Sequence, residues 1–232
     1  MTDFDHIAES MLIQLWERVR FINEGTKLEL APSDMIVLRL SWTSFVAGDL
    51  SNRGFECFLR MFKNHPKTQE VFEFARGTDS AQMQNSSRLL FHVTRVMKYI
   101  GKVVENLDSL EDVVPMLRQL GGRHGTAGYN VPPEYFPFFG EAMRQLMKEG
   151  SKNFDDKKEK LWTELYTFII DQLKVGQKEY GSQKNLCLLM KEGFKNWDDK
   201  KEKLWTELYT FIIDQLKVGQ KEYGSTKKMA TT

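Results

Sequence analysis

Apolar residues recur at intervals of three and four along most of this chain, which is the spacing that places them on one face of a helix. Stretches that alternate apolar and polar residues, as a half-buried strand would, do not occur. The fold class predicted from this pattern is therefore all-α. The helices it predicts cover residues 4–22, 32–46, 51–65, 86–104, 110–120, 134–149 and a stretch that begins at 155. Residues 67–74 are expected to form a short helical turn, and the polar residues 75–87 a loop.

A long repeat occupies the last third of the chain. Residues 146–182 recur at 189–225, and only two of the 37 positions differ. The differences are Ser151, which becomes Phe194, and Phe154, which becomes Trp197. A single duplication is not a solenoid, because stacked repeats need about three or more units.

The repeated unit contains the end of one helix and the whole of the next. We expect the first copy to take the native position, because the short turn after Gly150 closes it at a lower cost in loop entropy. The second copy would then expose its own apolar face unless it docks on the domain, self-associates or exchanges between chains. That face carries Trp205, Leu208, Tyr209, Ile212 and Leu216.

Composition narrows the classes of function. The 232 residues include 33 basic and 32 acidic side chains, so no basic surface argues for nucleic acid as a partner. No apolar run approaches the ~18 residues of a membrane span. Two cysteines, Cys57 and Cys187, do not make a disulfide framework, which favours a reducing, cytoplasmic setting. Acidic residues at 3, 5 and 9 stand where a secretory signal would need basic and apolar ones.

Two of the four histidines replace apolar residues in the helical pattern. His92 shares a predicted helix face with Val93 and Val96, and His124 continues the face of Leu117 and Leu120. The 32-residue gap rules out a shared helical face, but two helices can present both imidazoles to one pocket. A structural histidine with a satisfied hydrogen bond is the alternative for each. Zinc is disfavoured, because no close Cys/His spacing supplies further ligands.

The other two histidines carry a weaker signal. His6 lies in the first predicted helix, where we expect an exposed side chain. His65 precedes Pro66, which disfavours a helical conformation for it, and a histidine at such a corner is expected to face solvent.

Several motifs in order resemble the globin family. They are Trp42, the run FLRMFKNHP that contains Phe58, Phe72 six residues after Pro66, and then FHVTRVM and LGGRH. Their order and intervals are similar to those of neuroglobin-like globins over residues 31–181. This resemblance implies a three-over-three helical sandwich that holds haem b.

The resemblance also implies roles for particular residues. His124 is the proximal and His92 the distal histidine at the haem iron. Arg95 matches a basic position that can pair with a haem propionate through a charge-assisted hydrogen bond. The residues expected to border the haem are Phe58, Phe72, Val96, Leu120 and Phe136.

The function implied is reversible binding of oxygen or another small gaseous ligand rather than enzymatic turnover. In neuroglobin-like proteins the distal histidine can itself occupy the sixth position on the iron, so His92 is expected to compete with the gas. Two alternatives stay open. One is redox chemistry at the same iron, such as electron transfer or reactions with nitrite or NO. The other is gas sensing, with the output passing through a terminal extension.

The chain departs from the common globin pattern in three places. Residues 1–30 form an amphipathic extension, expected to dock on the domain or a partner, and residues 182–232 hold the duplicated segment. This segment allows self-association of the chain. Gly121 and Gly122 precede the proximal position, and each glycine is expected to loosen that helix by roughly 1 kcal/mol relative to alanine.

Overall fold

A computed structural model of the chain describes residues 27–79, 82–83, 86–125, 128–193, 198, 200, 202–203 and 206–207. The helix predicted over 4–22 and its His6 lie outside these residues. The chain divides into two compact units, one formed by residues 25–177 and the other by 1–24 together with 178–232. Each is described by itself below.

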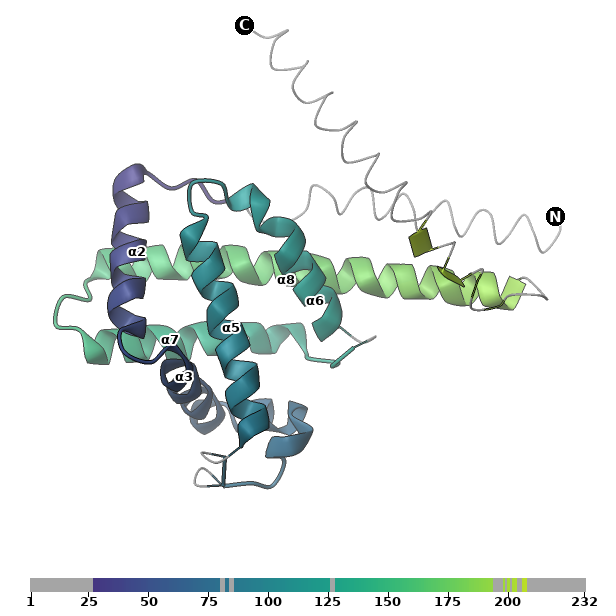
Figure 1. Ribbon diagram of the computed structural model, residues 1–232, viewed down its shortest axis with the longest axis horizontal. Coiled ribbons are helices and arrows are strands. Elements are labelled where there is room, and N and C mark those ends of the chain that lie inside the picture. Colours follow the sequence, from purple (N-terminus) through teal and green to yellow (C-terminus); the bar gives the residue numbers. More distant parts are fainter. Residues whose placement is uncertain are drawn as a thin grey trace, which may run out of the picture. The chain divides into compact units, whose positions relative to one another are not determined.

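The regular elements in the described residues are all helical, which confirms the all-α prediction. They are α2 (Pro32–Val46), α3 (Leu50–Asn64), η1 (Pro66–Val71), η2 (Glu73–Ala75), α5 (Ser87–Glu105), η3 (Leu110–Asp112), α6 (Val114–His124), η4 (Pro133–Tyr135), α7 (Phe136–Gly150) and α8 (Asp156–Gly193). Figure 1 shows α5 passing in front of α7 and α8, whose axes are nearly parallel and whose chain directions are opposite. None of the helices in the described part of the chain is long and apolar enough to span a bilayer.

Local sequence explains where the central helices begin. The Asp49 side chain accepts a hydrogen bond from the Asn52 amide at 2.9 Å and so caps α3. Ser86 caps α5 in the same way, because its hydroxyl oxygen accepts from the Leu89 amide at 3.3 Å. Capping side chains satisfy amides that have no partner within the helix. Pro32 occupies the first turn of α2, where its missing N–H costs nothing.

The core of the unit 25–177 is built where helices approach closely. Gly54 on α3 lies against α5, where an added Cβ atom would sit 2.6 Å from the Met97 side chain. On α2, Trp42 packs beside Trp162 of α8 with ring centroids 6.0 Å apart. The largest fully buried side chains are Leu38, Leu89, Val93, Met97, Val103, Leu117, Met143, Trp162 and Leu165. Trp162 and Leu165 belong to the first copy of the repeat, so this copy fills the core of the unit.

Two local expectations differ from the structure, which also gives the end of the last helix that the sequence left open. The turn predicted over 67–74 is split into the 3₁₀ helices η1 and η2, and Phe72 lies between them. Gln82 and Met83 are helical inside the predicted loop, with Met83 buried in the core. Helix α8 continues to Gly193, past the end of the first copy of the repeat.

The two copies of the repeat begin their second helix alike. In the first copy the Glu159 amide donates to the Asp155 carbonyl oxygen at 3.0 Å, and in the second Glu202 does the same to Asp198 at 3.0 Å. The Thr163 hydroxyl donates to the Glu159 carbonyl oxygen at 2.8 Å. Thr206 repeats that bond to Glu202 at 2.9 Å. Identical sequence therefore produces the same helix start in both places.

Candidate functional site

His92 lies among aromatic rings from α3 and the short helices. Its ring is edge-on to Phe58, with centroids 5.4 Å apart, and edge-on to Phe72, at 5.3 Å. Phe58 and Phe72 are themselves 5.7 Å apart, and Phe62 is 5.5 Å from Phe72. Three of the residues singled out by the sequence thus form one cluster, whereas Phe62 was not among them.

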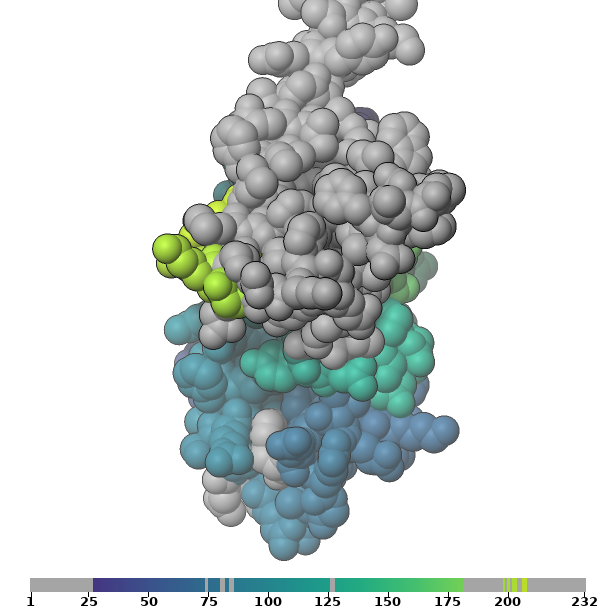
Figure 2. Space-filling model, turned by 90° about the vertical axis from the view of Figure 1, so that its right-hand side faces the viewer, coloured from purple at the N-terminus to yellow at the C-terminus, as the bar shows by residue number. Residues whose placement is uncertain are grey.

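The position of Phe72 follows from how its segment is held. The Gln69 amide nitrogen donates to the carbonyl oxygens of Ala75 at 2.6 Å and Thr78 at 2.9 Å. These bonds close the segment that contains Phe72, and η2 contacts α5. Figure 2 shows the η1–η2 segment and the first turns of α5 next to each other on this face of the unit.

His124, the last residue of α6, is fixed by a bond within its own helix. Its Nδ1 atom lies 2.8 Å from the Leu120 carbonyl oxygen. A carbonyl oxygen only accepts, so Nδ1 carries the hydrogen and the lone pair of the neutral ring belongs to Nε2. Histidines that ligate metals are held by a backbone carbonyl in this way. Phe136 and Tyr129 lie edge-on to the ring, with centroids at 6.0 and 5.6 Å.

Both imidazoles are kept neutral by their surroundings. Desolvation, followed by the positive charges that His124 and Arg95 can carry, lowers the pKa of His92 to about 4. Desolvation also lowers the pKa of His124, although its bond to Leu120 acts in the opposite direction. Each neutral imidazole therefore offers a nitrogen lone pair, His92 from α5 and His124 from the end of α6.

Four of the five apolar residues predicted to border a haem are partly buried. Phe72, Val96, Leu120 and Phe136 pack against the core but remain partly exposed. Side chains that are covered on one side and open on the other are what an apolar crevice requires. Phe58 differs, since only 4% of it is exposed. The set is mostly apolar, with two neutral nitrogen donors, and so fits a flat hydrophobic cofactor whose iron takes axial nitrogen ligands.

Arg95 stands apart from this cluster. It is exposed, and its guanidinium carbon lies 5.6 Å from the centroid of the Phe91 ring, one turn earlier on α5. A guanidinium stacked on an aromatic face keeps its N–H groups directed outward at the ring edge. Its pairing with a propionate remains a proposal.

The packing of α6 against α8 explains why position 121 is a glycine, which the sequence did not reveal. A Cβ atom added at this position would lie 2.0 Å from the Leu173 carbonyl oxygen of α8, a distance that no real contact allows. The glycine therefore permits a close approach of α6 to α8. The expectation that the glycine pair merely loosens the helix is incomplete, because packing against α8 also holds it.

His65 is not the exposed corner residue that the sequence predicts. Its ring stacks on Phe138 with centroids 3.7 Å apart and an angle of 10° between planes. Its Nε2 atom lies 3.2 Å from the Glu141 carboxylate. In the described residues, no three His, Cys, Asp or Glu side chains gather where they could hold a metal ion.

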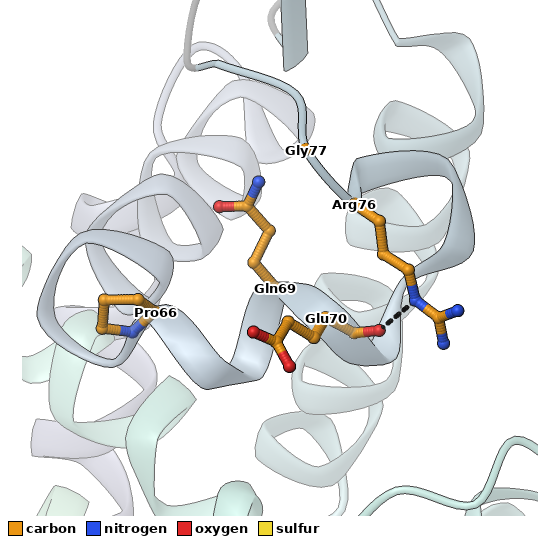
Figure 3. A pocket seen from close by; sticks show the side chains of 5 residues that line it. All are labelled: Pro66, Gln69, Glu70, Arg76 and Gly77. Carbon is orange, nitrogen blue, oxygen red and sulfur yellow. Dashed lines mark hydrogen bonds between the residues drawn. The ribbon is translucent and has the colours of Figure 1, made fainter.

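A separate hollow of about 570 Å³ lies beside η1, and neither His92 nor His124 lines it. Its lining residues are Pro66, Gln69, Glu70, Arg76 and Gly77. Figure 3 shows Gln69 rising from η1 toward the Gly77 turn, and Arg76 reaching back to the Glu70 backbone. The Arg76 Nε atom donates to the Glu70 carbonyl oxygen at 2.6 Å. None of the residues predicted to border a haem lines this hollow.

Comparison with known proteins places this geometry in a family. The globin family model matches residues 55–173, about half of the chain. Polymeric component P3 of the globin of Glycera dibranchiata is 29% identical over 150 residues, which cover 64% of this chain and 98% of that protein. Cytoglobin-2 of Oryzias latipes is 30% identical over 60% of this chain and 78% of its own. Neuroglobin of Tetraodon nigroviridis is 26% identical over 67% of this chain and 98% of its own. With this match over half its length, and with the helices and paired histidines described above, the chain belongs to the globin family.

Proposed function

We propose that this chain holds haem b between α5 and α6 and binds oxygen or another diatomic gas reversibly, with His124 as the proximal ligand. Membership of the globin family implies haem and oxygen binding in general. The assignment of individual residues rests on the geometry around the two histidines. Bound haem would supply an iron that takes a nitrogen ligand from the protein and binds a small gas, and His124 would hold it.

His124 suits the proximal role because its ring is already prepared for ligation. The bond from Nδ1 to Leu120 fixes the tautomer and leaves the Nε2 lone pair for a metal. Since desolvation lowers the pKa of His124, the ring does not need to lose a proton before it binds. Leu120, whose carbonyl oxygen holds the ring, and Phe136, which lies edge-on to it, would provide apolar surface beside His124.

His92 is the residue that decides how a gas binds. It is neutral at physiological pH, so it can either donate its N–H to a ligand or offer its own lone pair. We propose the second, with His92 as an internal competitor for the sixth position. The apparent affinity for the gas is then reduced to the fraction of molecules in which His92 has moved away. Phe58 and Phe72 contact the His92 ring and limit where it can go.

The observation that carries this proposal is the pair of neutral imidazoles on α5 and α6, with the tautomer of His124 fixed by Leu120. The direct test is an absorption spectrum of the full chain after addition of haem, in the ferric, ferrous and CO-bound forms. We expect a Soret band and a six-coordinate, low-spin ferrous spectrum. A five-coordinate, high-spin ferrous spectrum would remove His92 from the iron and leave the rest of the proposal intact.

Three histidine variants test the roles of His124 and His92 separately. His124→Ala is expected to lose stable haem binding, whereas His92→Ala keeps the haem and becomes five-coordinate. His65→Ala is the matched control, because His65 is half-buried against Phe138 and Glu141 instead. It should leave the spectrum unchanged. Retention of a wild-type spectrum by His124→Ala would contradict the proximal assignment.

A further inference from the structure

We propose that Gln177 on α8 is a positioning residue that fixes the end of α6 and, through it, the orientation of the His124 ring. The inference rests on the proposed role of His124. It concerns how the proximal side is held rather than which residue binds the iron.

The two helices meet backbone to backbone. An added Cβ atom at Gly121 would lie 2.0 Å from the Leu173 carbonyl oxygen, and one at Gly176 would lie 2.0 Å from the Arg118 carbonyl oxygen. Each helix therefore presents a glycine to the other's backbone. An approach this close leaves no room for side chains to adjust, so α8 acts as a fixed support along α6.

Polar contacts secure the same pair of helices. The Arg118 Nε atom donates to the Gln172 side-chain oxygen at 3.0 Å. Five residues further along α8, the Gln177 side-chain amide nitrogen donates to the carbonyl oxygens of His124 at 3.1 Å and Val131 at 2.9 Å. The Val131 amide also donates to the His124 carbonyl oxygen at 2.8 Å. Gln177 thus joins both sides of the turn that follows α6.

The hydrogen bonds of Gln177 affect the His124 imidazole through the last turn of α6. His124 is the final residue of that helix, and its ring is bonded to Leu120 within the same turn. The ring consequently moves with the turn, and whatever fixes the turn also fixes the ring. The carbonyl groups at a helix end have no partner within the helix. The His124 carbonyl oxygen is therefore held from outside α6, by the Val131 amide and the Gln177 side chain together.

The test uses Gln177→Met in the full chain, which keeps the length of the side chain and removes both donors. The first readout is amide hydrogen exchange in the haem-free protein. We expect the amides of His124 and Val131 to exchange roughly tenfold faster, as for the loss of one or two hydrogen bonds. The second is the iron–histidine stretching frequency of the five-coordinate species formed when CO is photodissociated. We expect it to shift, because the ring is free to turn.

Thr163→Val is the matched control, since the Thr163 hydroxyl on the same helix also donates to a backbone carbonyl oxygen, that of Glu159 at 2.8 Å, but this bond stays within α8. It should alter neither readout. An unchanged stretching frequency in Gln177→Met overturns the inference, and so does an equal change in both variants. If the wild-type chain binds no haem, the proposed function has failed, while the exchange rates still decide whether Gln177 fixes the end of α6.

Discussion

Gly140 on α7 faces the ring of Tyr166 on α8, and a Cβ atom there would lie 2.2 Å from the ring. Gly140→Ala is therefore expected to destabilise the protein by about 1–3 kcal/mol, the usual cost of overpacking. Gly150, at the end of the same helix, has no atom within 4 Å of an added Cβ. Gly150→Ala should instead stabilise by roughly 0.5–1 kcal/mol, because alanine loses less backbone entropy. Urea unfolding of both variants measures the difference, and equal midpoints would contradict the close approach of α7 to α8.

His92 makes the stability of the haem-free protein depend on pH. Its pKa is about 4 in the folded chain, lowered first by desolvation and then by the charges of His124 and Arg95. In the unfolded chain the value returns to about 6.5. Between these values the unfolded state binds a proton that the folded state does not, so stability falls as pH drops from 6.5 toward 4. The loss from this residue reaches at most about 3 kcal/mol near pH 4.

The measurement is the free energy of unfolding of the haem-free protein, by urea, at pH 7 and pH 4.5. His92→Gln should reduce the fall between them without abolishing it, since the pKa of His124 is lowered as well. A wild-type chain and a variant with the same pH dependence would show that His92 is not buried in the absence of haem.

Single residues divide into those that a pattern can identify and those that only a contact reveals. His92 and His124 stand out in the sequence because each interrupts an apolar stripe, and family motifs add Phe58 and Phe72. Tyr129 gives no such signal. It reaches His124 because the chain turns back after α6, at a point where Asn130 has a φ of 52°. Gln177 and Gly121 likewise act only where α6 and α8 approach each other.

At the scale of helices, the contact between α6 and α8 predicts non-additive substitutions. Gly121→Ala and Gly176→Ala each force a Cβ atom against the other helix, so each is expected to cost about 1–3 kcal/mol. Once one substitution has separated the helices, the second meets less resistance. The double variant should therefore cost at least about 0.5 kcal/mol less than the sum of the two. Thermal or urea unfolding of the wild type, the two single variants and the double variant measures the coupling free energy between the two positions. Strict additivity would mean that the two glycines act independently.

The helices themselves were largely predictable from the sequence. The residues predicted for α2 match the structure at both ends, and α3 and α5 begin within one residue of the prediction, where Asp49 and Ser86 provide caps. The errors occur where local signals are weak. A polar segment conceals the helical turn at Met83, whose burial depends on the core around it. The 3₁₀ helices also escape prediction, because the 3.6-residue period that identifies an α-helix does not apply to them.

At the scale of the whole chain, the repeat raises the question of which copy completes the globin unit. We propose that residues 31–181 are sufficient. In the first copy, Leu165 is fully buried and Trp162 donates to the Ser41 hydroxyl at 2.9 Å. A chain that ends at Gly181 should therefore keep its Soret band and its helical circular dichroism. Loss of both in that chain would mean that residues 182–232 are needed for the fold.

A matched pair of substitutions tests the same point in the full chain. Leu165→Asp places an unpaired carboxylate in the core, which is expected to unfold the globin unit and abolish haem binding. Leu208→Asp makes the same change at the identical position of the second copy and should leave both intact. Residues 155–182 of the first copy are identical to residues 198–225 of the second, so only their place in the chain distinguishes them.

The first copy has a much shorter connection to α7 than the second. The shorter loop lowers the entropic cost of closure by about 2 kcal/mol. A second copy that substitutes for the damaged first copy would overturn the expectation for Leu165→Asp. Leu165→Asp would then remain folded in the full chain but not in the chain that ends at Gly181, and this difference would show that the duplication supplies a working spare helix.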